Sequence, residues 1–75
     1  MSKINHQIVS RLELEIGYAM AQACAAKSGA RYAAWYDVAG KLHDALRDYR
    51  AGFVDAATRA LKNAREAAAF AEVVK

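Results

Sequence analysis

The 75-residue sequence contains no proline and only one cysteine, Cys24. Proline in a helix interior costs about 3 kcal/mol, so no residue of that kind interrupts a helix in this chain. A single cysteine excludes an internal disulfide and a zinc site built from several thiolates, and it fits a protein of a reducing compartment. Because unpaired cysteines usually pack as small apolar groups, we expect the Cys24 thiol to be buried.

Motifs that carry chemistry are also lacking. The sequence has no G-x-S-x-G motif and no glycine-rich phosphate loop, and its two histidines, His6 and His43, have no cluster of carboxylates or thiols around them. Asp44 follows His43, but consecutive helix positions point about 100° apart and do not face each other. A chain this short also leaves little room for a pocket of several hundred Å³. We therefore expect no enzyme activity, no catalytic residues, no metal and no cofactor.

No apolar run is long enough to cross a bilayer, which takes about 20 residues. The most apolar stretch, residues 16–26, includes Gln22 and follows Glu13 and Glu15, where an export signal requires positive charge. We therefore expect a soluble cytoplasmic protein that does not bind a membrane. The formal net charge of +3 is far below that of a dedicated nucleic-acid arm, and its main consequence is solubility.

Alanine, the most helix-favouring residue, makes up about a quarter of the chain. From Arg31 to Tyr49, apolar residues recur at three- and four-residue steps with charged residues between them, the pattern of an amphipathic helix with one buried face. Residues 27–29 form a stop signal, with Gly29 as a left-handed cap, and Gly52 forms another. A short connection between helices makes them antiparallel neighbours.

The sequence therefore predicts an all-α fold, a three-helix antiparallel bundle in a single domain of residues 1–75. The expected helices cover about residues 4–28, 30–51 and 54–74. One alternative stays open, because Gly52 has no loop residues around it. Residues 30–74 would then form one long helix in a helical hairpin, which would have to dimerise to cover its far half.

The expected core is thin, because alanine methyl groups bury little area. Gly17 and Gly40 lie inside expected helices, where glycine suggests the close approach of another helix. Too few bulky side chains remain to satisfy three helices, so we expect a homodimer or another protein partner. In the first helix the expected core line is Ile4, Ile8, Leu12, Ile16, Met20 and Ala23, with a second, weaker line at Val9, Leu14 and Tyr18.

The candidate partner-binding residues are Arg31, Tyr32 and Tyr36. The two tyrosines lie four residues apart and off the line that runs from Trp35 to Leu42. Tyrosine and arginine dominate interface energetics because they combine a large area with a polar tip. We expect a small protein-binding module, an inhibitor or adaptor that occupies a surface of a partner, with Trp35 supporting the site from behind. The tyrosines could instead pack over the first helix near Tyr18.

A small DNA-binding regulator is the alternative function. Residues 25–38 follow the spacing of a helix-turn-helix, with Gly29 at the turn. Arg59, Lys62 and Arg65 form a second basic candidate, for nucleic acid or an acidic partner, which Arg47 or Arg50 could extend. We expect nucleic-acid binding less than protein binding, because the same charges also suit an ordinary solvated face.

One partial resemblance concerns the segment from Trp35 to Ala64, which contains in order the residues Trp35, Val38, Ala39, Leu42, Gly52, Phe53 and Ala56. This order resembles a tetratricopeptide helical hairpin, a family whose members bind peptides, but the first helix is several residues longer and there is one copy where at least three are needed. We therefore do not assign the chain to that family.

The small size and plain composition also suggest a phage or mobile-element accessory protein.

Overall fold

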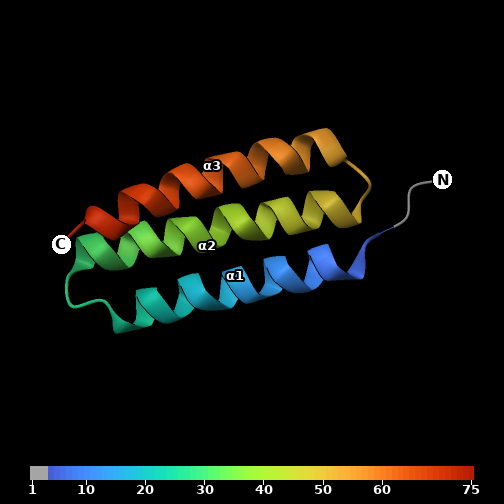
Figure 1. Cartoon of the computed structure of the whole chain (residues 1–75). Coiled ribbons are helices and arrows are strands. Elements are labelled where there is room, and N and C mark those ends of the chain that lie inside the picture. The colour runs from blue at the N-terminus through green and yellow to red at the C-terminus, as the bar shows by residue number, and fades with distance from the viewer. Residues whose placement is uncertain (1–3) are drawn as a thin grey trace.

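A computed structural model describes residues 4–75, which form three helices joined by short connections (Figure 1). Helix α1 spans His6–Ala25, α2 spans Gly29–Arg50 and α3 spans Val54–Val73. The described residues contain no strand. The predicted three-helix antiparallel bundle is confirmed, and each observed helix bound lies within three residues of the predicted one.

Side-chain caps begin the first two helices. The Gln7 backbone N–H donates to Asn5 Oδ1 at 2.9 Å, and the Arg31 backbone N–H donates to Ser28 Oγ at 3.1 Å. Each cap satisfies a backbone donor that lacks an intrahelical partner, and such caps contribute about 1 kcal/mol. Because only residues 26–28 connect α1 to α2, the two helices must run antiparallel.

Gly52 separates α2 from α3. Its φ of 89° lies in the left-handed region that glycine adopts at little cost. The Gly52 N–H donates to the Tyr49 carbonyl and the Phe53 N–H donates to the Asp48 carbonyl, which are the two bonds of a Schellman motif. The alternative of one long helix over residues 30–74 is therefore wrong. Gly29 is not the predicted left-handed cap, because it is the first residue of α2.

Helix α2 is the central element of the bundle. Both α1 and α3 pack along it, and the backbones of α1 and α3 nowhere approach each other within 8 Å (Figure 1). A closed three-helix bundle has three helix–helix interfaces, whereas this one has two. One side of α2 is therefore left open between α1 and α3.

The buried core contains little bulk, as predicted. Seven of its thirteen apolar residues are alanine, while eleven large apolar side chains are exposed on the surface. The larger core residues are Val9, Leu12, Trp35, Val38, Leu42 and Leu46.

Several expectations for α1 and α2 are wrong. Ile4, Ile8 and Met20 are exposed, because the line of α1 that faces α2 runs instead through Val9, Leu12, Ile16, Ala19 and Ala23. No helix crosses closely at either helical glycine, since a Cβ added at Gly17 or Gly40 would meet nothing within 4 Å. The Cys24 thiol is exposed, because α1 turns that position away from α2.

Candidate functional site

Tyr32 and Tyr36 form an exposed aromatic pair on α2. Their side chains are 47% and 53% exposed, and their rings stack with centroids 5.8 Å apart and an interplanar angle of 26°. The four-residue spacing places both on one side of the helix. The sequence left open whether the tyrosines pack over Tyr18 or are exposed, and the structure shows them exposed.

Trp35 lies behind this pair in the core and is only 3% exposed. The Tyr18 ring of α1 meets the indole edge to face, with centroids 5.8 Å apart and planes at 82°. The indole N–H has no hydrogen-bond partner among residues 4–75. Trp35 thus holds α1 against α2 by packing, and it gives the turn that carries the aromatic pair a rigid base.

Arg31 has a different position from the one expected of a partner-binding residue. Its side chain is half-buried, and Nη1 donates to the Val74 carbonyl at 2.9 Å and to the Ala71 carbonyl at 3.5 Å. These carbonyls belong to the end of α3. The Ala71 carbonyl also accepts from the Val74 N–H at 3.3 Å, whereas the Val74 carbonyl follows the last helical residue and has no intrahelical donor. Arg31 therefore fastens the end of α3 to the start of α2, and Ser28 Oγ adds a bond to the Lys75 carbonyl at 2.9 Å.

The basic residues of α3 are all exposed, but they do not form one line. Steps of three residues turn each side chain about 60° back around the helix, so Arg59 and Arg65 point about 120° apart, with Lys62 between them. Arg65 lies 4.0 Å from the Glu15 carboxylate of α1. The two arginines of α2 that were expected to extend this face have acidic neighbours instead: Arg47 lies near Asp44 and Asp48, and Arg50 lies near Glu13.

The structure does not form the helix-turn-helix expected at residues 25–38. In that motif the second helix crosses the first at a steep angle of about 90–120°. Here α1 and α2 lie side by side and antiparallel over their length (Figure 1). The DNA-binding alternative therefore rests on the basic residues of α3 alone.

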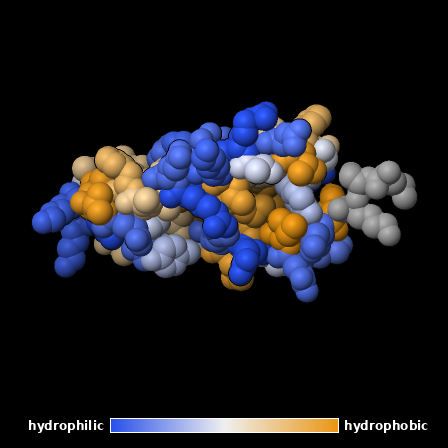
Figure 2. Space-filling view, turned by 45° about the horizontal axis from the view of Figure 1, so that its top comes forward, coloured by the Kyte–Doolittle hydropathy of each residue, from blue (hydrophilic) through white to orange (hydrophobic). Residues whose placement is uncertain are grey.

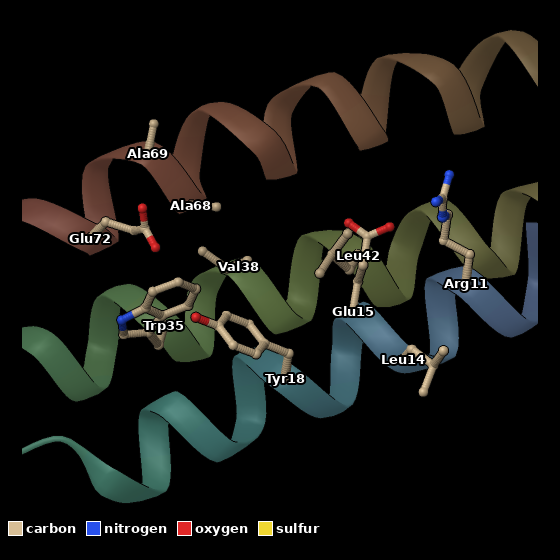
Figure 3. Close-up of a pocket in the computed structure, with 10 residues that line it drawn as sticks. All are labelled: Arg11, Leu14, Glu15, Tyr18, Trp35, Val38, Leu42, Ala68, Ala69 and Glu72. Atoms are coloured by element: carbon tan, nitrogen blue, oxygen red, sulfur yellow. The ribbon is translucent and has the colours of Figure 1, made fainter.

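A hollow of about 460 Å³ lies between α1 and α3, over the open side of α2. The expectation that so small a fold has no room for such a pocket is wrong, because α1 and α3 stand apart. Figure 3 shows the floor formed by α2, with Tyr18 and Leu14 projecting from α1 and the alanines from α3. The lining residues are Arg11, Leu14, Glu15, Tyr18, Trp35, Val38, Leu42, Ala68, Ala69 and Glu72.

A second hollow of about 200 Å³ continues along the same side of α2. The α2 residues that line the two hollows recur at alternating steps of three and four, which places them on one stripe of the helix. We call the two hollows together the α1–α3 groove. Figure 2 shows apolar side chains gathered between hydrophilic ones in the half of the molecule nearer the N-terminus. The lining residues of the second hollow are Ile8, Leu12, Ala45, Tyr49, Val54, Ala57, Thr58 and Leu61.

The sequence reasoning missed this groove. The helical period at Trp35, Val38, Leu42, Ala45 and Tyr49 predicts a buried core and does not indicate a groove. In the structure the first four of these residues are 1–4% exposed, and the same stripe also lies beneath the two hollows.

Charged side chains stand along the edge of the groove. Arg11 and Glu15 project from α1 and Glu72 from α3 (Figure 3). Glu15 lies near Arg65 across the groove, whereas Arg11 and Glu72 form no ion pair with any residue between 4 and 75. The groove therefore combines an apolar floor with one cation and one carboxylate that no other described charge neutralises.

Comparisons with known proteins gave no match to a family model, to a curated protein or to a solved structure. None of the three helices is long and apolar enough to span a membrane. Within residues 4–75, no three metal-binding side chains come together in a group that could hold an ion. The function is therefore inferred from the aromatic pair, the basic residues of α3 and the groove.

Proposed function

We propose that the protein is a protein-binding module, an inhibitor or adaptor that acts by occupying a surface of a partner protein. The observation that carries this proposal is the placement of apolar bulk. Most core positions hold alanine, whereas Tyr18, Tyr32, Tyr36, Phe53 and Phe70 are all exposed. Solvent-exposed aromatic groups of this size stabilise a protein little when it is alone, but they are the residues that dominate binding energy in interfaces.

The aromatic pair is the proposed anchor. Tyr32 and Tyr36 are stacked on one another, and the buried Trp35 fixes the same turns of the helix, so little conformational freedom remains to be lost on binding. Each ring offers a large apolar area and a hydroxyl group that can find a polar partner. Arg31 supports this anchor by fixing the first turn of α2 to α3.

The test compares the partner proteins that the wild-type protein captures with those that a Tyr32→Ala/Tyr36→Ala variant captures. Phe70→Ala is the matched control, because it removes an exposed aromatic ring from α3. A partner that the wild type and Phe70→Ala retain, and that the tyrosine variant loses, is then titrated. Tyr36→Ala should weaken its binding by about 1–3 kcal/mol, and Tyr36→Phe should retain most of the affinity. If all variants capture the partner equally well, the aromatic pair is not part of the interface.

The proposal also includes self-association. The thin core and the many exposed apolar side chains favour a homodimer in solution. Sedimentation at micromolar concentration tests this, and one species near the monomer mass of 8.2 kDa would contradict it. The single cysteine suits a reducing compartment, and the chain is small and plain in composition. We therefore also propose that this module acts in the cytoplasm, as an accessory protein of a phage or mobile element.

A small DNA-binding regulator is the second candidate. It is favoured by the exposure of Arg59, Lys62 and Arg65, of which the first two form no ion pair within residues 4–75. Titration of a DNA duplex at several salt concentrations separates the two functions. Phosphate contacts by this face should give an affinity that falls steeply with salt, whereas a protein-binding module should show no measurable duplex affinity.

A further inference from the structure

We propose that the α1–α3 groove binds one amphipathic α-helix of another protein, which completes a four-helix bundle. This extends the proposed protein-binding function to a second surface. The two surfaces are separate, because neither Tyr32 nor Tyr36 lines either hollow. The groove inference therefore does not depend on the aromatic pair.

The shape of the groove fits a single helix. Helices α1 and α3 both pack on α2, whereas their own Cα atoms stay more than 8 Å apart, so the position that a fourth helix takes in a bundle is empty. The two hollows follow one stripe of α2, from Trp35 to Tyr49, which makes the site long and narrow. A second copy of this chain facing the groove would oppose one concave surface to another and leave the hollows unfilled, which forfeits packing contacts.

Because the surface of the groove is largely apolar, we expect the occupant to have a hydrophobic face. Leu14 is 76% exposed and Tyr18 is 55% exposed on α1, and Val54 is exposed on the α3 side. Below them lie Trp35, Val38 and Leu42, which are only 2–4% exposed, so the occupant would rest mainly on Leu14, Tyr18 and Val54. A helix with apolar side chains at positions i, i+3 or i+4, and i+7 would cover this surface.

The charges of the groove define the occupant further. The contacts of Tyr18 with Trp35 and of the Asn5 N–H with Tyr49 Oη fix how the antiparallel helices α1 and α2 are aligned. In this alignment Arg11 of α1 lies beside about Leu42 of α2. Glu72 follows Ala71, whose carbonyl accepts a bond from Arg31.

Arg11 and Glu72 are therefore about ten or eleven residues apart along α2, or about 16 Å. Glu72 also lies in the last turn of α3, where the helix dipole disfavours a negative charge. Within the chain this carboxylate has an unfavourable position, which a cation of the occupant would improve.

The expected occupant thus carries a lysine or arginine near Glu72 and a carboxylate near Arg11. Positions eleven residues apart lie about 16 Å apart along a helix, which matches the spacing of the two groove charges along α2, and long lysine and glutamate side chains extend to the opposite edges from which Glu72 and Arg11 project. The Arg65–Glu15 contact spans the groove at 4.0 Å between side chains that are largely exposed or half-exposed. Such a pair is worth little, so the entry of a helix can displace it at a small cost.

The experiment uses three 18-residue amphipathic peptides without tryptophan, identical except at two positions eleven residues apart. These positions hold Lys and Glu, Glu and Glu, or Lys and Lys. The fluorescence of Trp35, the only tryptophan, reports binding at the groove floor, and the anisotropy of a dye on the peptide gives the affinity. The Lys/Glu peptide should bind about tenfold more tightly than the other two.

Charge reversal in the protein sharpens this test. Glu72→Lys should transfer the preference to the Glu/Glu peptide, and Arg11→Glu should transfer it to the Lys/Lys peptide, whichever direction the peptide runs. Leu14→Asp should weaken all three peptides by at least about tenfold, and because Leu14 is exposed this variant should still fold. The Tyr32→Ala/Tyr36→Ala variant should bind the peptides as the wild type does.

Three results would overturn the inference. They are the absence of binding by any peptide, a preference that Glu72→Lys and Arg11→Glu leave unchanged, and a wild-type dimer that Leu14→Asp dissociates, which would make a second copy the occupant. None of these results bears on partner capture by the aromatic pair, so failure of the groove inference and failure of the proposed function can be told apart.

Discussion

The interface between α2 and α1 differs in composition from the interface between α2 and α3. Towards α1, the contact includes Trp35 with Tyr18, and α1 itself buries Val9 and Leu12. Towards α3, every buried residue that α3 contributes is alanine, at positions 57, 64 and 71. Helix α1 is thus held by bulky side chains together with Ala19 and Ala23, whereas the buried residues of α3 are all small and repeat every seven residues, or about two turns.

This difference shows two ways of fixing a helix in a small bundle. Large side chains bury much area and tolerate some distance between the helices, whereas alanine needs close approach and gives less area for each residue. The weaker alanine contact of α3 is supplemented by polar bonds at its end, where Arg31 and Ser28 bind carbonyls of residues 71, 74 and 75. The predictions below test this contrast, from the largest expected effect to the smallest.

Trp35→Ala should break the interface with α1. The side chain is 3% exposed, and removing a buried tryptophan costs about 3–5 kcal/mol, which is a large part of the stability of so small a domain. Urea unfolding followed by circular dichroism measures the loss. Trp35→Phe retains part of the volume and should lose less. A loss below about 1 kcal/mol for Trp35→Ala would contradict the assigned role of bulk in this interface.

Ala64→Leu should break the interface with α3 by overpacking. Ala64 is 1% exposed, so the additional carbons have no space and should cost about 1–3 kcal/mol. The matched control is Ala69→Leu in the same helix, because Ala69 is exposed. Unfolding in urea should show a change within about 0.5 kcal/mol for the control. Equal effects of the two variants would mean that α3 does not depend on close approach.

Arg31→Ala should loosen the end of α3 and leave the rest of the bundle in place. The variant loses the bonds to the Val74 and Ala71 carbonyls, which we expect to cost about 1 kcal/mol. Amide hydrogen exchange should speed up in the last turns of α3 and not in α1. Arg47→Ala is the control, since that arginine is exposed and lies near acidic residues of its own helix only. Uniform exchange changes would argue against a local role.

Tyr36→Ala should have the smallest effect on stability. The side chain is 53% exposed and lies in neither hollow of the groove, so the free energy of unfolding should fall by less than about 0.5 kcal/mol. The helical circular-dichroism signal should be unchanged. If this variant unfolds, Tyr36 belongs to the core, and its proposed role as an anchor must be given up.

The sequence predicted the positions of the helices well, but it predicted less well which side of each helix is buried. The period from Trp35 to Tyr49 placed α2 and its buried face, because α2 has neighbours on both flanks and its apolar stripe is wide. In α1 the predicted line held Leu12 and Ala23 correctly but was wrong at Ile8 and Met20, since Val9 and Ala19 are buried in their place. Hydrophobicity alone favours isoleucine and methionine for the core, whereas the distance between two packed helices favours alanine at the closest points.

Among the candidate sites, local features could likewise be predicted from the sequence, whereas features that depend on distant residues could not. The place of Tyr32 and Tyr36 off the apolar stripe of α2 is a local property that the sequence shows, whereas their exposure was decided by the position of α1. The bond from Arg31 to Val74 joins residues 43 apart in the sequence and left no local signal. The groove likewise depends on the absence of an interface between α1 and α3, which no periodicity within one helix predicts.

By itself the sequence determined that the chain is helical and where the helices begin and end to within three residues, because helix propensity, the caps at Asn5 and Ser28, and the left-handed turn at Gly52 all act within a few residues of the chain. It left open whether residues 30–74 form one helix or two. Only the tertiary structure decided which side of each helix is covered, that Cys24 is exposed, and that α1 and α3 stand apart over α2. The physical reason is that these features come from packing between residues distant in sequence, where the fit of alanine and bulky side chains sets the spacing of the helices.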